Sequence, residues 1–365
     1  MSDNTRDLAL VFSGGNAVGA YHAGTYEALH EHGLRPDWVV GASMGAVTAA
    51  IIAGNAPEER VAKLRMFWDE ATQNTGPSPT EMLKPRQIYN GVHALMTLVW
   101  GRPSIFGHRL PGLWSALPWM PNDVALFDNK PLLRTLDRVV DFERLNQGDT
   151  RLTVGCVDIE TGEEVYFDTS REEIRPEHIL ASTAILPAFP PVEIEGRVLC
   201  DAGFTNNLPL DPVFASEPER DLLCIASDLF GLKAPRPASL DAVLERANDL
   251  IFASAPRRAI AGLRREYDLR QKLDPTGPAV TLLHLVYQAG AEELAAKSFD
   301  FSPSSIRDRW SAGRRDAAHG LNLLQGANSE RSRFEYVVLP EATVMAAPAR
   351  TSHAAGTRTS MAKRA

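Results

Sequence analysis

The sequence of 365 residues is poor in cysteine, with only Cys156, Cys200 and Cys224, which lie far apart. No C-x-x-C pair occurs, and no histidine cluster accompanies a cysteine. A disulfide framework and a structural zinc site are therefore not expected, and a reducing compartment fits best.

Long apolar runs and an excess of positive charge are also missing. No uninterrupted run reaches the roughly 20 residues that a membrane-spanning helix needs. The first residues, MSDNTRDLALVF, show no basic segment followed by an apolar one, so no secretory signal is visible. The net charge of -8 disfavours a nucleic-acid partner. We expect a cytoplasmic protein that could still sit peripherally on a membrane; the oligomeric state is left open.

The composition is that of a globular protein, with 44% hydrophobic and 23% charged residues. Near the start, apolar strands at 8–12 and 38–40 alternate with helical patterns at 20–32 and 46–53, with glycine-rich turns between them. Such alternation predicts an α/β layered fold with a mostly parallel sheet, whose chemistry lies at the carboxyl ends of the strands.

The remaining pattern predicts further elements of both kinds. Helices are expected at 57–75, 178–184, 240–252, 257–273 and 291–296. Strands are expected at 152–157, 164–167, 192–194, 198–199, 222–227, 280–286 and 335–339, the first four forming two hairpins. The tail at 346–365 has no periodicity and is predicted to be disordered.

Residues 76–127 form a proline-rich and tryptophan-rich stretch between predicted elements. Long irregular segments inside a compact domain are usually functional or mobile. We expect a lid or a lipid-facing insertion, in which Arg102, His108 and Arg109 meet head groups. The alternatives are a small subdomain with its own aromatic core and a solvated charged face.

The sequence Gly41-Ala42-Ser43-Met44-Gly45 is a G-x-S-x-G motif between a predicted strand and a predicted helix. A serine on such a turn is pushed out of the backbone, and the flanking glycines remove the Cβ atoms that would block it. Ser43 is therefore a candidate nucleophile with Gly41 and Gly45 forming its elbow. The alternative is a turn that is glycine-lined only for packing.

Two other segments have a composition that suits acyl transfer. The turn containing Gly14, Gly15 and Asn16 follows a strand and can present several backbone N–H groups to an oxyanion. It matches neither G-x-G-x-x-G nor a Walker loop, so nucleotide phosphate binding is the weaker interpretation. Asp201, at the end of a predicted hairpin, could take a proton from Ser43, or could simply cap a turn.

In this order, the three segments resemble those of patatin-like phospholipases: a glycine-rich loop, a G-x-S-x-G and a D-G-[GA] segment. The stretch 181–191, ASTAILPAFPP, also resembles the family segment before the aspartate. The resemblance covers about residues 7–230, and the following region resembles the C-terminal extension of a bacterial subgroup.

The resemblance implies a three-layer α/β/α domain at 7–232 with a mostly parallel sheet, followed by a mainly helical region at 233–345. It implies hydrolysis of lipid acyl esters, of the phospholipase A type or a related esterase, without metal or other cofactor. By position, Ser43 is the nucleophile, Asp201 is its base, and the amides at Gly14, Gly15 and Asn16 form the oxyanion hole.

Three positions depart from the family pattern. Asn16 replaces a glycine and Val18 a basic residue, which would weaken oxyanion stabilisation and shift preference toward neutral esters. Ala202 replaces a glycine and adds a Cβ that could displace Asp201.

The sequence also allows other catalytic residues and other functions. His284 and His319 follow Asp201 and could complete a triad, although structural histidines are the simpler interpretation. The functional alternatives are a lipid-binding or regulatory protein without turnover and a soluble carboxylesterase or thioesterase.

Overall fold

The computed structural model describes residues 6–73, 85–234, 236–290, 293–326 and 332–339. Its central sheet contains nine strands, β1 (Arg6–Phe12), β2 (Trp38–Ala42), β5 (Arg151–Asp158), β6 (Glu164–Asp168), β7 (Val192–Ile194), β8 (Arg197–Asp201), β9 (Asp221–Asp228), β10 (Val280–Val286) and β11 (Phe334–Val338). Two short strands, β3 (Gly107–His108) and β4 (Phe127–Asp128), pair with each other in the insertion.

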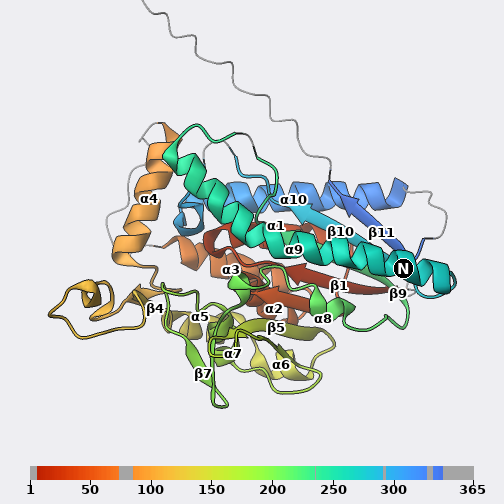
Figure 1. Ribbon diagram of the computed structural model, residues 1–365, viewed down its shortest axis with the longest axis horizontal. Coiled ribbons are helices and arrows are strands. Elements are labelled where there is room, and N and C mark those ends of the chain that lie inside the picture. The colour runs from red at the N-terminus through yellow and green to blue at the C-terminus, as the bar shows by residue number, and fades with distance from the viewer. Residues whose placement is uncertain (1–5, 74–84, 235, 291–292, 327–331, 340–365) are drawn as a thin grey trace, which may run out of the picture.

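The helices surround this sheet (Figure 1). They are α1 (Ala20–Glu31), α2 (Met44–Ala53), α3 (Arg60–Thr72), α4 (Arg86–Trp100), α5 (Pro131–Val139), α6 (Phe142–Gln147), α7 (Pro176–Ser182), α8 (Asp211–Phe214), α9 (Leu240–Leu273) and α10 (Pro303–Gly326). Four short 3-10 helices complete the described elements: η1 (Asn16–Gly19), η2 (Gly112–Ala116), η3 (Ala202–Phe204) and η4 (Lys297–Phe299).

The strand order is β11-β10-β9-β1-β2-β5-β8-β7, with β6 also paired to β5. The six strands from β11 to β5 are parallel, and β6, β7 and β8 form an antiparallel part at one end. A run of parallel strands aligns their carboxyl ends along one edge, where ligands usually bind in such folds.

Successive residues of β1 face opposite layers, which explains its uninterrupted apolar sequence. Leu10 lies in the core that includes α1, α2, α3 and α10, whereas Val11 lies in the core that includes α8 and α9. The predicted three-layer α/β/α fold is therefore confirmed, and α9 crosses the face that Figure 1 shows.

The C-terminal third is integrated into the fold. Strands β10 and β11, predicted at 280–286 and 335–339, extend the parallel sheet. Helix α10 packs along α1, and the crossing is close because Gly24 and Gly313 face the partner helix backbone without a Cβ. The predicted tail at 346–365 and the start of the insertion, 76–84, lie outside the described residues.

Two helix predictions are wrong. The separate helices at 240–252 and 257–273 are one continuous helix, α9, which passes through the buried Pro256. No helix occupies 293–296, the described part of the predicted helix at 291–296. Helix α4, which falls in a segment expected to be irregular, has an amphipathic sequence and packs on η4.

Candidate functional site

Ser43 lies at the junction where β2 ends and α2 begins. Its backbone has φ 55° and ψ -127°, a conformation that non-glycine residues adopt rarely and that is associated with functional turns. A Cβ on Gly41 would collide with the Gly45 backbone, and a Cβ on Gly45 with the carbonyl of Phe12. The two glycines therefore permit the turn that projects the serine from the start of α2.

Ser182 stabilises the Ser43 turn through hydrogen bonds. The backbone N–H of Ser43 donates to Ser182 Oγ at 2.9 Å, and the Ser182 hydroxyl donates to the carbonyl of Gly155 at 2.6 Å. Ser182 is buried at the end of α7, in the stretch that links the hairpins. The sequence resemblance includes this residue but does not reveal its contact with the serine turn.

Sheet register places Asp201 beside Ser43, although 158 positions separate them in the sequence (201 less 43). Ala42 on β2 pairs with Gly155 on β5, and the next residue of β5, Cys156, pairs with Asp201 on β8. The backbone N–H of Asp201 also donates to the carbonyl of Ala184. Both side chains line the same cavity.

The Asp201 carboxyl group is buried, with 1% of its surface exposed. Its Oδ1 accepts a hydrogen bond from the N–H of Gly203 at 2.7 Å, while Oδ2 has no hydrogen-bond partner of normal geometry among the described residues. Burial raises the pKa of Asp201 to about 6, and interactions with the Ser43 hydroxyl and the Gly203 amide oppose this rise. Oδ2 of this carboxylate can therefore accept a further hydrogen bond, in the cavity that Ser43 also lines.

Ala202 fits at the position where the family pattern has glycine. Its side chain is buried in a small apolar cluster with Ala42, Val157 and Cys200. The residue does not have a positive φ, and Asp201 still bonds to Gly203. The added Cβ therefore packs in this cluster.

The glycine-rich loop lies against the serine. A Cβ on Gly14 would come within 2.8 Å of Ser43 Cβ and 2.6 Å of Asn207 Oδ1. The Gly14 N–H donates to the carbonyl of Asn207 at 3.1 Å, and Asn207 Nδ2 donates back to the Gly14 carbonyl at 3.2 Å. The Gly14 N–H, which the sequence analysis placed in the oxyanion hole, is thus already engaged, whereas within the described chain the N–H groups of Gly15 and Asn16 have no acceptor.

The substitutions at positions 16 and 18 have structural explanations. Asn16 has φ 49°, and asparagine is among the few residues that tolerate this left-handed region in place of glycine. Val18 is fully buried in the core and does not line the Ser43 cavity. Neither residue supplies a cation to the cavity.

The cavity next to Ser43 has a volume of about 240 Å³. Among the described residues that line it there is no histidine, lysine or arginine, and Asp201 is the ionisable group. Its walls include Ile105 from the insertion and five residues of the C-terminal third that the sequence analysis did not identify: Asn248, Phe252, Ala295, Ser298 and Phe299.

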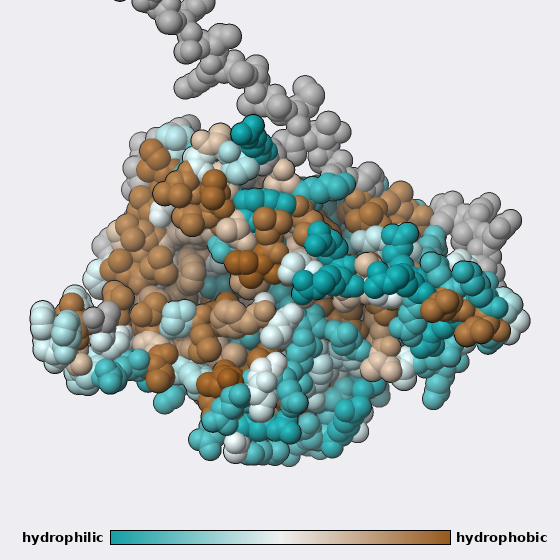
Figure 2. Space-filling view, in the orientation of Figure 1, coloured by the Kyte–Doolittle hydropathy of each residue, from teal (hydrophilic) through white to brown (hydrophobic). Residues whose placement is uncertain are grey.

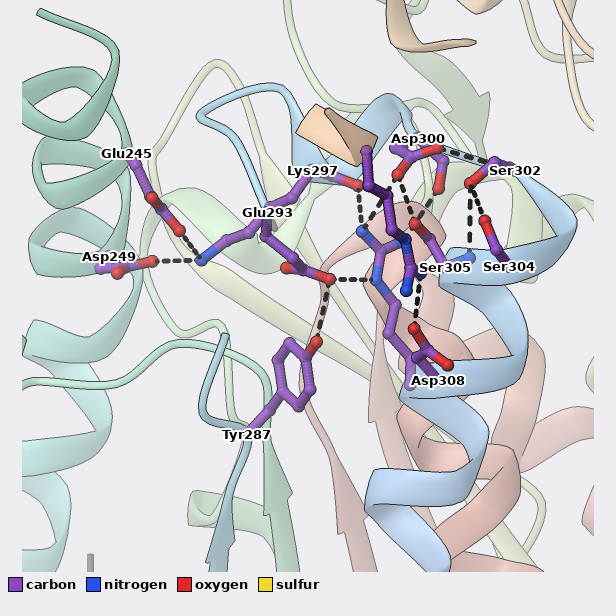
Figure 3. A network of polar contacts seen from close by, with 12 residues as sticks. Glu245, Asp249, Tyr287, Glu293, Lys297, Asp300, Ser302, Ser304, Ser305 and Asp308 are labelled. Atoms are coloured by element: carbon purple, nitrogen blue, oxygen red, sulfur yellow. Dashed lines mark hydrogen bonds and ion pairs between the residues drawn. The ribbon is translucent and has the colours of Figure 1, made fainter. Parts of the chain in front are cut away.

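A buried network of charges holds the C-terminal wall in place (Figure 3). Lys297, only 4% exposed, pairs with Glu245 at 3.1 Å and Asp249 at 3.0 Å, both on α9. Arg309 on α10 pairs with Glu293 at 2.7 Å and donates to backbone carbonyls of the same segment. Since η4 also packs on η1, this network connects α9 and α10 to the glycine-rich loop.

The candidate histidines lie elsewhere. His284 and His319 line a different cavity, and His284 bonds to Asp228 and Tyr336. His22 is buried under the glycine-rich loop, where it bonds to the Ser13 carbonyl and the Ser227 hydroxyl, and burial lowers its pKa to about 4. The structure thus gives no support to a histidine-assisted triad.

The described part of the insertion exposes several large apolar side chains. Leu110 is 83% and Trp119 76% exposed, and the other members are Trp100, Leu113, Trp114 and Val124. On the face shown in Figure 2, apolar surface gathers on the side where α4 lies. Exposed apolar patches often mark surfaces that contact a membrane or another protein.

The basic residues of the insertion differ in their surroundings. The prediction that Arg102 meets a head group is wrong, because its side chain is fully buried and donates to Thr97 Oγ1 and to carbonyls of Thr72 and Gln73. Arg109 is paired with Asp123 at 2.8 Å. His108 is exposed.

Two features are absent from the described residues. No helix in that part of the chain is long and apolar enough to cross a membrane. No group of three His, Cys, Asp or Glu side chains there could hold a metal ion.

A serine on a strand-to-helix turn at the edge of a layered α/β sheet is the arrangement of a large class of α/β hydrolytic enzymes. A family model described as patatin-like phospholipase matches residues 10–214, which is 205 of the 365 residues, so the chain belongs to the patatin-like phospholipase family. A second model, described as patatin phospholipase, matches residues 261–331. Membership supports the hydrolysis of lipid acyl esters as the class of activity.

Similar proteins share only part of their length with this chain. Triacylglycerol lipase ptl3 of Schizosaccharomyces pombe is 41% identical over 63 residues, which are 17% of this chain and 13% of that protein. The crystal structure of VipD from Legionella pneumophila gives a TM-score of 0.42 at 15% identity, covering 87% of this chain and 67% of that one. Human GIVD cytosolic phospholipase A2, bound to methyl γ-linolenyl fluorophosphonate, gives 0.42 at 13%, covering 89% and 59%. Structural similarity at this level supports no inference about mechanism.

Proposed function

We propose that the protein is a serine-dependent lipid acyl hydrolase in which Ser43 and Asp201 act as a catalytic dyad. The observation that carries the proposal is the buried Oδ2 of Asp201, which has no other partner among the described residues and lines one cavity with Ser43. The absence of histidine from the described wall of that cavity leaves the carboxylate as the base.

The proposed reaction proceeds in two halves. Asp201 takes the proton of the Ser43 hydroxyl while Oγ attacks the ester carbonyl, and the N–H groups of Gly15 and Asn16 stabilise the oxyanion that forms. Collapse of this intermediate breaks the ester bond, and the protonated Asp201 gives its proton to the departing alcohol. Asp201 then deprotonates a water molecule, which attacks the acyl-serine; as the Ser43 Oγ–acyl bond breaks, the protonated Asp201 returns this proton to Ser43 Oγ and the carboxylic acid is released.

The cavity favours an apolar acyl chain and an uncharged ester environment. Ile105, Phe252 and Phe299 give it apolar walls, and its described lining has no cation to bind a phosphate. We therefore infer a preference for neutral lipid esters, presented by a lipid surface that the exposed apolar residues of the insertion contact.

Two alternative functions predict different results in labelling and rate measurements. A lipid-binding protein without turnover would bind the same chains but would not react covalently at Ser43. A soluble carboxylesterase or thioesterase would react, but its rate would not rise when the ester passes from monomers to micelles.

The test is mass spectrometry after exposure to a long-chain fluorophosphonate. A single adduct on Ser43 is expected, absent in Ser43→Ala and at least about 100-fold slower to form in Asp201→Asn, since the base is lost. Ser216→Ala, which removes an exposed hydroxyl far from the cavity lining, should label like the wild type. No adduct on the folded wild-type protein, or an equal rate in Asp201→Asn, would overturn the dyad.

A further inference from the structure

A second and larger cavity, of about 780 Å³, lies at the same edge of the sheet as Ser43. Its walls come from the carboxyl ends of β9, β10 and β11 and from the flanking helices α9 and α10. The crevice outside the carboxyl ends of parallel strands is the usual place for ligands in open α/β sheets. The proposed hydrolytic reaction does not use this cavity.

Phe230 separates the two cavities, since it lines both of them. Its ring packs against Phe252 of the Ser43 cavity, with ring centroids 4.8 Å apart. The two spaces are therefore neighbours with different chemistry. The Ser43 cavity has no lysine or arginine in its described wall, whereas the second cavity has four such residues, Lys233, Arg257, Arg264 and Arg315.

Three of these cations have no ion-pair partner within the described chain. Arg257 and Arg264 lie one below the other on exposed turns of α9, and Arg315 faces them from α10. Arg264 also lies over the ring of Tyr336, 5.8 Å from its centroid. In a chain with a net charge of -8, a local gathering of unpaired guanidinium groups is unexpected for a solvated surface.

The acidic groups of the cavity are already engaged with other side chains. Asp228 lies 3.3 Å from His284 Nε2 and also accepts from the N–H of Phe230. Asp316 accepts from the Tyr21 hydroxyl at 2.9 Å, and burial raises its pKa. Of the remaining titratable groups of the lining, His319 is exposed and the Tyr336 hydroxyl bonds to His284 Nδ1 at 2.9 Å. Within the described chain, neither acid forms an ion pair with Arg257, Arg264 or Arg315.

The cavity also has an apolar part of its lining. It is formed by the side chains of Leu232, Ala253, Ile260, Ala261, Val286 and Ala312. A volume of several hundred cubic ångströms with apolar walls and a few charged groups is typical of small-molecule sites. A free inorganic anion would leave this apolar surface unused, and an uncharged lipid would leave the guanidinium groups unpaired.

We propose that this cavity binds an amphiphilic anion, with an acidic head group held by Arg257, Arg264 and Arg315 and an aliphatic chain along the apolar wall. Guanidinium groups pair with carboxylates and phosphates through parallel hydrogen bonds, so either head group satisfies the site. The inference does not depend on hydrolysis at Ser43.

The test is calorimetric titration of the full-length Ser43→Ala protein, in which turnover cannot consume the probe. Laurate, dodecyl phosphate, inorganic phosphate and dodecanol are titrated separately. We expect laurate or dodecyl phosphate to bind at least about tenfold more tightly than phosphate or dodecanol, because only they use both parts of the site. Comparing the affinities for laurate and dodecyl phosphate shows whether the site prefers a carboxylate or a phosphate head group.

Charge-matched variants locate the binding site. Arg257→Gln with Arg264→Gln, and separately Arg315→Gln, should weaken amphiphile binding about tenfold or more. Arg258→Gln with Arg265→Gln removes the same charge from exposed positions of α9 that do not line the cavity, and should change little. Ser298→Trp, which fills the Ser43 cavity instead, should also leave this binding intact.

Equal affinities in the two arginine pairs would overturn the proposal, as would loss of binding in Ser298→Trp alone. Tight binding of dodecanol that persists in Ser298→Trp, where the Ser43 cavity is filled, would show that the cations have no role and would likewise overturn it. None of these results bears on whether Ser43 labels with fluorophosphonate, so the two proposals fail separately.

Discussion

Asp201 links the pH dependence of reactivity to that of stability, and the two should change in opposite directions. Burial raises the pKa of this carboxyl to about 6, from an ordinary value of 3.8. Only the ionised form can accept the Ser43 proton. The rate of fluorophosphonate labelling should therefore fall about tenfold for each pH unit below about 6 and level off above it.

The same pKa has the opposite consequence for folding. The folded state binds the Asp201 proton more tightly than the unfolded chain does, so the free energy of unfolding falls as pH rises from about 4 to about 6. The difference of about 2 pKa units corresponds to about 3 kcal/mol, at about 1.4 kcal/mol per unit. Asp201→Asn, which cannot ionise, should be more stable than wild type by up to this amount near pH 8, and by little near pH 4.

Two measurements check this reasoning. Labelling rates of the wild type are recorded across pH 4.5 to 8 by intact-protein mass spectrometry, and urea unfolding of wild type and Asp201→Asn is compared at both ends of the range. A labelling rate that does not change between about pH 5 and 7 would refute the assignment of the base. Equal stability of the two proteins near pH 8 would refute the proposed cost of burying the charge.

Three further substitutions test the architecture of the site. Gly45→Ala places a Cβ against the Phe12 carbonyl and should lower the free energy of unfolding by about 3 kcal/mol, whereas Gly107→Ala, with open space around it, should cost under about 0.5 kcal/mol; urea unfolding measures both. Lys297→Met leaves two acidic side chains of α9 without their cation and should cost about 3 kcal/mol in the same assay, and a cost near zero would show that the network is dispensable. Ser298→Trp fills part of the Ser43 cavity and should lower kcat/KM for long-chain esters about tenfold relative to short-chain esters, which a chain-length series measures; a uniform loss would contradict the proposed acyl pocket.

The sequence by itself determined the local features of the site. The apolar residues before Gly14 and before Ser43 specify buried strands, and glycines beside them permit turns that a Cβ would block. The contact of Gly41 with the Gly45 backbone is local, and the motif of the serine turn can be recognised without the fold. The contacts that also require glycine at positions 14 and 45 come from Asn207 and Phe12, which only the fold brings close. The alternation of strands and helices likewise predicted the layered α/β architecture, which the structure confirms.

Tertiary structure decided the features that depend on packing between distant segments. The sequence pattern predicts separate helices at 240–252 and 257–273, yet α9 continues through Pro256, although a proline inside a helix costs about 3 kcal/mol. Burial of Ala253, Ile260 and Tyr267 on the same helix offsets that cost. Arg102 was expected at a surface, and only the fold shows that backbone carbonyls surround it.

The pairing of Ser43 with Asp201 and the closure of their cavity have the same origin. Strand register brings the two residues together across β5, and the Lys297 network brings the C-terminal segment over them. Neither contact leaves a periodic pattern in the sequence, because each joins residues more than 40 positions apart. The chain sequence specifies which groups are present, and long-range packing sets their burial and therefore their chemistry.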